Sequence, residues 1–382
     1  MEIPLSYDLR NAFDTERKIL MYCGFYPNEG RMNKFFYYLS GFYHFSISVL
    51  IQLSMTVLIA LYITSLSTIA EVLLFFMTQA AFLSKLFMFI IKKDRLSKME
   101  EILSNPIFYK LSNGNFDTVT NYIASTKTFA VCFRISCFLV CAMNVILPLL
   151  SSKDQAMLLG WEPWEVADDA FKYYLNRIFQ LKALFVSAYV NSTIDVLVYM
   201  LITIATALIE ILKINLVKIQ YDEENAKKQF NENVFLHYEI LRFVSVIEDT
   251  FSIGILSQIF ASVLVICFTG FQMIIVSIID INSELKLIYL IRSLMFLLKV
   301  YNSYLSLIYF MCMMCQVALY CWFGHYLIAS SDAIIESIYM SNWYESDLSL
   351  RRSILIFMER CKKPIILKAG YLFPLSLETF TS

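Results

Sequence analysis

The chain has 382 residues, of which 58% are apolar and 16% are charged, and its formal net charge is −1. Soluble globular domains are nearer to about 45–50% apolar and about 25% charged, so this composition excludes an ordinary soluble protein. A net charge this close to zero offers no basic face, so nucleic acid is not an expected partner.

Six apolar runs follow one another along the chain, each about as long as a bilayer is thick. They cover residues 36–63, 69–91, 128–150, 183–212, 255–280 and 294–323. A helix that crosses about 30 Å of hydrocarbon needs about 20 mostly apolar residues, and backbone amides in lipid must be bonded within their own helix. The runs therefore predict an all-α integral membrane protein. A seventh segment is expected to begin near Ile365.

Several connecting segments also have helical patterns. The N-terminal stretch predicts a short helix over roughly 11–23, ended by Gly24 and Pro27. Segment 213–254 is predicted to be helical with one apolar face, formed by Val234, Tyr238, Leu241, Val244 and Glu248 with Phe235 and Ile240 beside them. Segment 324–363 is predicted to be similar, with Leu350, Ile354, Phe357 and Cys361 on its apolar face, a cap at Ser346 or Asp347, and an end at Pro364.

Lysine and arginine alternate between the two sets of connections. The set formed by residues 1–35, 92–127, 213–254 and 324–368 carries 22 of them, whereas the set formed by 64–68, 151–182 and 281–293 carries six. Connections rich in lysine and arginine stay on the cytoplasmic side. The N-terminus and segment 213–254 are therefore predicted to be cytoplasmic, and segment 151–182, with Trp161 and Trp164, to lie outside as headgroup anchors or a lid over a vestibule.

A few charged residues fall within the apolar runs. Lys85 and Arg134 can extend to the inner headgroups, so anchoring is their expected role. Asp195 lies about twelve residues into the fourth run and should face protein or a hydrated cavity. Two interpretations stay open for Asp195, a structural hydrogen bond to a neighbouring helix and a functional polar site.

Sequence patterns of enzyme chemistry are not found. The three histidines, His44, His237 and His325, have no metal-ligand spacing to a cysteine or carboxylate. There is no phosphate-binding glycine loop and no nucleophile elbow. We therefore expect no catalytic residue, no metal and no cofactor, and a protein that binds apolar molecules, moves ions, or does both.

The C-terminal part carries a family resemblance. Its residues include Gly324-His325-Tyr326-Leu327-Ile328, Ser330-Ser331, Tyr339, Trp343-Tyr344, Arg351-Arg352, Lys363-Pro364 and Lys368-Ala369-Gly370-Tyr371-Leu372-Phe373-Pro374-Leu375-Ser376-Leu377-Glu378-Thr379-Phe380. This sequence pattern resembles the C-terminal signature of the insect odorant receptors over about 324–382. Because segment 213–254 lacks a long insertion, the chain looks like a variable, odorant-tuned subunit rather than the shared coreceptor.

The resemblance implies a seven-transmembrane fold with a cytoplasmic N-terminus. Residues 1–323 would form helices one to six with their connections, and 324–382 a cytoplasmic anchor helix and the start of the seventh helix. It also implies a ligand-gated cation channel in the plasma membrane, in which four subunits, usually tuned subunits with the coreceptor, surround one pore that small volatile odorants open.

The resemblance also suggests two sets of site residues. The positions that match the subunit anchor are Tyr339, Trp343, Arg351, Pro364, Gly370, Leu375, Ser376, Leu377 and Phe380. The ligand pocket of the family lies between helices two, three, four and six in the outer half and has no motif. Helix depth alone gives the pocket candidates Phe75, Phe76, Met143, Ile146, Tyr189, Thr193, Phe296 and Tyr301.

The seventh helix is expected to be incomplete. Twelve residues follow Gly370, and even a helix of that length reaches only about 18 Å, with Pro374 interrupting it. The 382-residue chain by itself is therefore expected to conduct no ions. Two alternatives remain, a gustatory receptor channel, whose distinguishing residues would lie in the seventh helix, and a G-protein-coupled chemoreceptor, which requires an extracellular N-terminus.

The predicted orientation can be tested with an epitope tag at Met1. Because the charge bias puts the N-terminus in the cytoplasm, the tag is expected to be stained by antibody only after the cells are permeabilised. Staining of intact cells would contradict the predicted orientation and favour the G-protein-coupled alternative.

Overall fold

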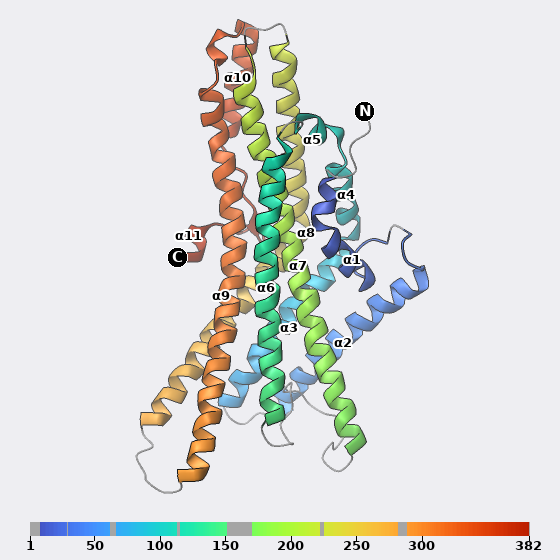
Figure 1. The fold of residues 1–382 in the computed structure, drawn as a ribbon, viewed down its shortest axis with the longest axis vertical. Coiled ribbons are helices and arrows are strands. Elements are labelled where there is room, and N and C mark those ends of the chain that lie inside the picture. The colour runs from blue at the N-terminus through green and yellow to red at the C-terminus, as the bar shows by residue number, and fades with distance from the viewer. Residues whose placement is uncertain are drawn as a thin grey trace.

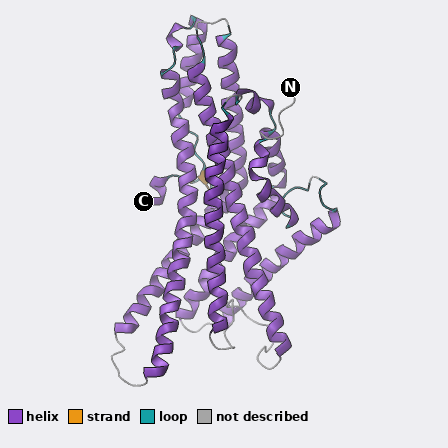
Figure 2. Ribbon diagram, viewed as in Figure 1, coloured by secondary structure: helices purple, strands orange, loops and turns teal. Residues whose placement is uncertain are grey.

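The computed structural model describes the backbone of residues 8–28, 30–61, 66–112, 115–150, 170–221, 225–281 and 289–381. Within these ranges, the side chains of 66–71, 144, 146–150, 170, 173, 271–281 and 289–306 are not described. The chain forms a bundle of long helices with short helices packed against its side, and the strands within the described ranges form one very short hairpin (Figures 1 and 2).

Long helices cover the six predicted apolar runs, apart from residues 62 and 63, which lie outside the described residues, so this part of the prediction is confirmed. They are α2 (Lys34–Leu61), α3 (Leu66–Ile91), α6 (Phe116–Leu150), α7 (Ala170–Lys218), α8 (Ala226–Ile281) and α9 (Tyr289–Tyr339). Within the described part of the chain, six helices are long and apolar enough to cross a membrane. The candidate lid around Trp161 and Trp164 lies outside the described residues.

Three of the long helices are much longer than a bilayer is thick. Helices α7, α8 and α9 have 49, 56 and 51 residues. At about 1.5 Å per residue each is more than about 70 Å long, over twice the hydrocarbon thickness. Their extensions gather with α10 (Leu348–Cys361) at one end of the bundle, which we call the stalk (Figure 1). The prediction that 213–254 is largely helical is confirmed.

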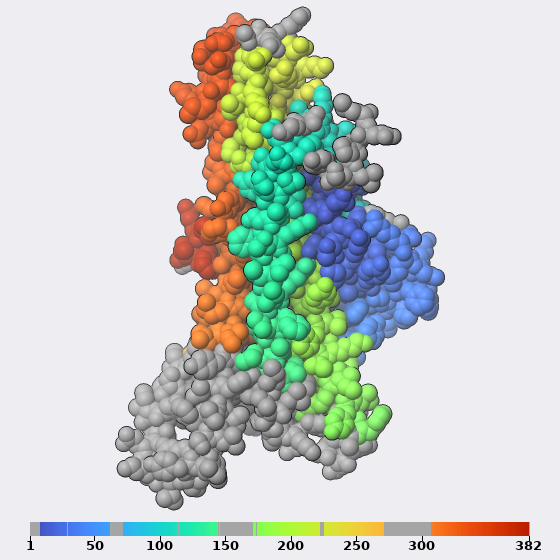
Figure 3. Space-filling model, in the orientation of Figure 1, coloured from blue at the N-terminus to red at the C-terminus, as the bar shows by residue number. Residues whose placement is uncertain are grey.

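Helix α7 is the centre of the bundle. Within its most apolar 18-residue window 94% of the residues are buried, compared with 11% in α2. The stretch from Ile194 to Leu212 is apolar on almost every side, and a helix of that kind is stable only when neighbours surround it. The space-filling view shows α6 lying over the middle of α7, with the N-terminal layer and α2 beside it (Figure 3).

The stalk corrects one sequence prediction. In α8 the buried face is formed by Leu236, Ile240, Phe243 and Ile247. Tyr238, expected on that face, is 58% exposed, and Phe235 is also exposed. Apolar residues occur on two adjacent sides of this helix, and the packing of α7, α9 and α10 decides which side is covered. The predicted face of α10 is confirmed, because Leu350, Ile354, Phe357 and Cys361 are all buried and Asp347 Oδ1 accepts a hydrogen bond from the Leu350 amide.

Short helices form a layer at the side of the bundle. They are η2 (Leu9–Phe13), α1 (Asp14–Tyr22), α4 (Lys93–Leu103) and α5 (Pro106–Leu111). Helix α1 ends where predicted, because Gly24 at φ +83° lets the chain turn and the amide of Phe25 bonds back to the Leu20 carbonyl. Gly24 also lies so close to Gly41 of α2 that a Cβ atom would be 2.4 Å from the Gly41 Cα.

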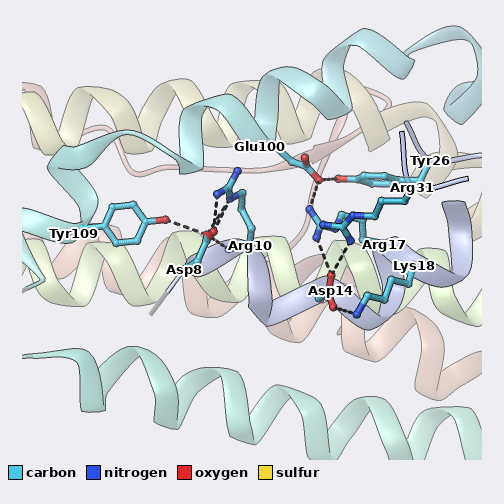
Figure 4. A network of polar contacts seen from close by, with 9 residues as sticks. All are labelled: Asp8, Arg10, Asp14, Arg17, Lys18, Tyr26, Arg31, Glu100 and Tyr109. Carbon is cyan, nitrogen blue, oxygen red and sulfur yellow. Dashed lines mark hydrogen bonds and ion pairs between the residues drawn. The ribbon is translucent and has the colours of Figure 1, made fainter. Parts of the chain in front are cut away.

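A network of charges joins η2 and α1 to α4 and α5 (Figure 4). Arg17 contacts both Asp14, at 2.8 Å, and Glu100 of α4, at 3.5 Å, while Glu100 accepts a hydrogen bond from Tyr26 at 2.7 Å. Farther along, the Asp8 carboxylate accepts from Arg10 and lies 3.2 Å from the Tyr109 hydroxyl of α5. These contacts hold the first helical turns of the chain against the bundle.

Electrostatic effects keep Asp8 ionised and Tyr109 protonated, as the hydrogen bond between them requires. Burial alone would raise the pKa of Asp8, but its hydrogen bonds from Arg10 outweigh burial and hold the pKa below its ordinary value. Burial and the neighbouring Asp8 carboxylate raise the pKa of Tyr109 to about 12. A carboxylate and a protonated phenol therefore face each other at neutral pH.

Arg134 of α6 does not act only as a lipid anchor, as the sequence suggested. Its Nη2 lies 2.7 Å from Glu16 Oε1 of α1, and Glu16 is almost fully buried. The N-terminal layer is therefore tied by ion pairs to α6 as well as to α4.

The C-terminal segment differs from the expected helix near Ile365. After η3 (Trp343–Glu345) and α10, residues 368–374 form a hairpin of β1 (Lys368–Ala369) and β2 (Phe373–Pro374), and the last helix, α11 (Leu377–Thr381), begins at Leu377. Pro364 and Pro374 cannot donate a helical hydrogen bond, and Gly370 and Tyr371 both turn at φ +60°. Ser252 of α8 holds the hairpin, accepting from the Gly370 amide at 2.9 Å through its carbonyl oxygen.

Glycine at position 324 is expected to be essential for stability. A Cβ atom on Gly324 of α9 would lie 2.3 Å from the Leu375 carbonyl oxygen, a backbone atom that cannot rotate away. We predict that Gly324→Ala lowers the free energy of unfolding by about 1–3 kcal/mol, measured as a lower melting temperature in detergent. Gly270→Ala on α8 is the matched control, because outside its own stretch of helix no described atom lies within 4 Å of the added atom. Equal melting temperatures for the two variants would contradict the close packing of α9 on the hairpin.

Candidate ligand-binding site

Asp195 is a fully buried carboxylate within the central helix α7, with 0% of its surface exposed. Its Oδ1 accepts a hydrogen bond from the Lys85 ammonium of α3 and one from the Tyr320 hydroxyl of α9, each at 2.5 Å. Its Oδ2 accepts from the Gln316 amide of α9, also at 2.5 Å. A buried charge is tolerated only when it is paired and hydrogen-bonded, and here partners from two helices meet that need.

Two further residues extend this group. The Lys85 ammonium also donates to Asn191 Oδ1 at 2.9 Å, and Gln258 of α8 donates to Gln316 Oε1 at 2.9 Å. We call these six residues the buried polar cluster: Lys85, Asn191, Asp195, Gln258, Gln316 and Tyr320. The cluster joins α3, α7, α8 and α9 inside the membrane-spanning bundle. Lys85 is only 3% exposed, so it does not extend to the headgroups as its sequence position suggested.

A cavity of about 120 Å³ lies beside the buried polar cluster, and Asn191 and Gln316 form part of its wall. The rest of the wall comes from α2, α3, α6, α7 and α9 and is mostly aromatic, aliphatic or thiol in character. Its residues include Ile51, Met55, Phe75, Phe82, Phe133, Val140, Leu184 and Met313, with the thiols of Cys137, Cys141 and Cys312. An apolar cavity of about 150 Å³ can hold benzene, so a small organic molecule fits here.

The cavity wall also carries an ordered pair of hydroxyl groups. Thr78 and Tyr309 lie 2.5 Å apart across the interface of α3 and α9. Because the Thr78 hydroxyl donates to the Leu74 carbonyl at 2.8 Å, its single proton is used and Tyr309 must be the donor between them. The arrangement resembles most ligand pockets, in which an apolar wall carries a few oriented polar groups.

The structure places the eight predicted pocket residues in different surroundings. Phe75 lines the cavity, and Phe76 packs beside it against the small apolar cluster of Ile51 and Ala183. Thr193 is fully buried, but its hydroxyl donates to the Tyr189 carbonyl, and Tyr189 itself is half exposed.

Of the other four candidates, Met143 is half-buried and is not part of the cavity wall as described. The side chains of Ile146, Phe296 and Tyr301 lie outside the described residues. The expected pocket helices two, three, four and six correspond to α3, α6, α7 and α9, and all four contribute to the cavity, together with α2.

Depth in the apolar run was a poor guide to the cavity, whereas polar residues at helical spacing were a usable signal. Asn191 and Asp195 are four residues apart on α7, and Gln316 and Tyr320 are four apart on α9, so each pair lies on one face. Thr78 and Lys85 are similarly placed on α3, seven residues apart. Asn191, Gln316, Tyr320 and Thr78 carry no charge, so charge within the apolar runs indicated Lys85 and Asp195 but not these four residues.

The predicted anchor residues lie around the stalk and the C-terminal hairpin. Tyr339 ends α9 and is 69% exposed, and Arg351 of α10 donates to the carbonyl oxygens of Tyr344 and Ser346. Gly370, Leu375 and Ser376 belong to the hairpin region, and Leu377 and Phe380 to α11. Pro364 follows α10, and Trp343 lies in η3.

Among all the described residues, no group of three or more metal-ligating side chains was found.

The fold and the cavity define a class, a multi-pass membrane protein with a small cavity between its helices. Residues 65–382 match the model of the 7tm odorant receptor family. The chain therefore belongs to the odorant receptor family.

Individual relatives agree with this assignment. Odorant receptor 85c of Drosophila melanogaster is 31% identical over 150 residues, which cover 39% of this chain and 33% of the relative. Odorant receptor 67a of the same species is 24% identical over 275 residues, covering 67% of this chain and 61% of the relative. In both comparisons the chain spans less than two thirds of the length of the relative.

Solved structures show the same fold. The insect olfactory receptor OR5 from Machilis hrabei superposes with a TM-score of 0.80 at 14% identity, covering 98% of this chain and 94% of OR5. The structure of OR5 in complex with eugenol gives a TM-score of 0.78 at the same identity, with 98% and 93% coverage. The predicted odorant-receptor architecture is confirmed at the level of the fold.

Removing one charge from the buried polar cluster is expected to lower the free energy of unfolding more than removing both charges. Asp195→Asn leaves the Lys85 ammonium buried without its counter-charge, which should lower the free energy of unfolding by about 3–5 kcal/mol. The double variant Lys85→Met with Asp195→Leu should recover much of that loss. Melting temperatures of the two purified proteins in detergent measure the difference. A double variant no more stable than Asp195→Asn would contradict a buried ion pair at this position.

Proposed function

We propose that the chain is the tuned subunit of an odorant-gated cation channel in the plasma membrane, assembled with a coreceptor, and that the cavity beside the buried polar cluster binds the odorant. The observation that carries this proposal is a mostly apolar cavity walled by five helices within an odorant-receptor fold. The OR5 structure in complex with eugenol supports it, because that protein of the same fold binds a small aromatic molecule.

The size and lining of the cavity suit weak binding of a volatile molecule. A ligand of the size of a phenylalanine ring buries about 200 Å² of apolar surface, worth about 5 kcal/mol at about 25 cal/mol per Å². The loss of translational freedom reduces that gain. With few polar groups to enforce orientation, several apolar molecules of similar volume should bind, so broad tuning is expected.

The stalk is the proposed site where subunits meet, on the cytoplasmic side that the lysine and arginine bias indicates. Large apolar side chains are exposed there, including Tyr339 at 69%, Met340 at 67% and Ile356 at 72%. Exposed apolar groups that cluster on one region are typical of protein–protein interfaces. Of the predicted anchor positions, Tyr339, Trp343, Arg351 and Pro364 lie in this region. Gly370, Leu375, Ser376, Leu377 and Phe380 lie in the hairpin region and α11, where Gly370 packs on Leu256 of α8 and Leu375 on Gly324 of α9.

Long helices provide a direct route from the cavity to the stalk. Helices α7 and α9 both contribute cavity wall residues and both continue into the stalk. A ligand that separates their walls would therefore act on the same rigid elements that carry the proposed subunit contacts. The buried polar cluster lies on this route, since Asp195 bonds to two residues of α9.

Filling the cavity tests this proposal. Cells that express the full-length protein with an odorant coreceptor are expected to give inward cation currents in response to some members of a panel of small ketones, esters and aromatics. Ala188→Phe, which adds a ring at the cavity wall, should raise the concentration needed for half-maximal current at least about tenfold, because the ring occupies the ligand's volume.

Leu139→Phe is the matched control, because Leu139 lies on the outer face of α6 with 54% of its surface exposed. It adds bulk outside the cavity and should leave the odorant response unchanged. An unchanged response in Ala188→Phe, with surface expression equal to the control, would contradict odorant binding in this cavity.

A further inference from the structure

The orientation of one amide at the cavity wall is fixed by its neighbour. Asn191 accepts a hydrogen bond from the Lys85 ammonium through Oδ1 at 2.9 Å, and the ammonium cannot bond to an amide nitrogen. The amide nitrogen, Nδ2, therefore points away from Lys85. Among the described residues Nδ2 has no hydrogen-bond partner, and Asn191 belongs to the cavity wall.

The same contacts make this N–H group a strong donor. Lys85 is held in place by Asp195 at 2.5 Å and is almost completely buried. A chain from carboxylate to ammonium to amide polarises each successive group, so the free end of the amide donates more strongly than an isolated amide would. Because Asn191 is already held by Lys85, binding a ligand would require no further ordering of its side chain.

Other donors at the wall already make hydrogen bonds, among them the Gln79 amide, which donates to the Ser48 carbonyl at 3.4 Å. The Thr78 hydroxyl donates to the Leu74 carbonyl, Tyr309 donates to Thr78, and the Ser192 hydroxyl donates to the Tyr189 carbonyl. The amide nitrogen of Gln316 donates to Asp195. Together with the hydroxyl of Ser187, Asn191 Nδ2 is thus a wall donor that the described residues leave without an acceptor.

We infer that the cavity selects small odorants that carry one hydrogen-bond acceptor, such as ketones, aldehydes and esters, and that Asn191 Nδ2 donates to the ligand oxygen. The inference rests on the proposed function, since it names the ligand class of the same cavity. Comparison with benzene, which has six non-hydrogen atoms and fits a slightly larger cavity, indicates a ligand of about six or seven non-hydrogen atoms. The oxygen lies at the polar end of the cavity and the hydrocarbon part against the aromatic and thiol wall.

Two molecules of nearly the same shape test this inference. Cyclohexanone has a carbonyl oxygen, and methylenecyclohexane has a CH₂ group in its place. The purified chain in lipid nanodiscs is treated with methyl methanethiosulfonate, and modification of the cavity thiols Cys137, Cys141 and Cys312 is followed by mass spectrometry. Cys132 is the internal control, because it is exposed on α6 and is not part of the described cavity wall.

The ketone is expected to protect the cavity thiols at about tenfold lower concentration than the alkene, the ratio that one net hydrogen bond of about 1.4 kcal/mol gives. Asn191→Leu should abolish that preference while still allowing both molecules to protect. Ser192→Ala should keep the preference, because it removes a hydroxyl at the same wall that already donates to a backbone carbonyl. This comparison of ratios separates ligand recognition from a general loss of packing.

Each other outcome has a definite meaning. If ketone and alkene protect equally in the unaltered chain, or if Asn191→Leu keeps the tenfold preference, the inference is wrong while odorant binding in the cavity stands. If neither molecule protects the three thiols up to its solubility, the cavity is not the binding site and the proposed function fails with it. The comparison in the unaltered chain decides the matter even if Asn191→Leu does not fold.

Discussion

The pairing of Lys85 with Asp195 is the interaction on which the centre of this membrane protein depends. Two opposite charges lie in a region that excludes water, at 3% and 0% exposure, and the desolvation of each is offset only if its partner and every accompanying hydrogen bond are in place. Those accompanying bonds come from α7, α8 and α9 as well as α3. The ion pair therefore restricts how far these helices can slide or rotate against one another, because a shift of one residue would leave a buried charge unpaired.

The cavity lies directly beside these charges. Polar side chains of α3, α7 and α9 converge at its polar end, and its wall is formed by α2, α3, α6, α7 and α9. Its wall has an asymmetric character, apolar over most of its area and polar where Asn191 and Gln316 reach it. A cavity built in this way can hold a hydrocarbon by burial and still distinguish one end of a ligand from the other.

The comparison with OR5 shows which properties of the sequence keep this fold. At 14% identity few individual residues can be shared, yet the two chains superpose with a TM-score of 0.80 over nearly their whole lengths. The lengths and order of the apolar helices, and the continuation of three of them beyond the membrane, are properties of hydrophobic pattern rather than of particular side chains. The close contacts at Gly24 and Gly324 in this chain add local constraints that pattern alone does not supply.

Hydrophobic length and period by themselves determined the six membrane helices, the end of α1 at Gly24 and the buried face of α10, because each depends on residues close together in the chain. They did not determine which side of α8 is covered, where the last helix begins, or that Lys85 turns inward. Nor did they locate the cavity. Of the predicted pocket residues, the described wall contains Phe75 alone. Those features depend on residues more than a hundred positions apart, such as Lys85, Asp195 and Gln316, and only the packing of whole helices brings such residues together.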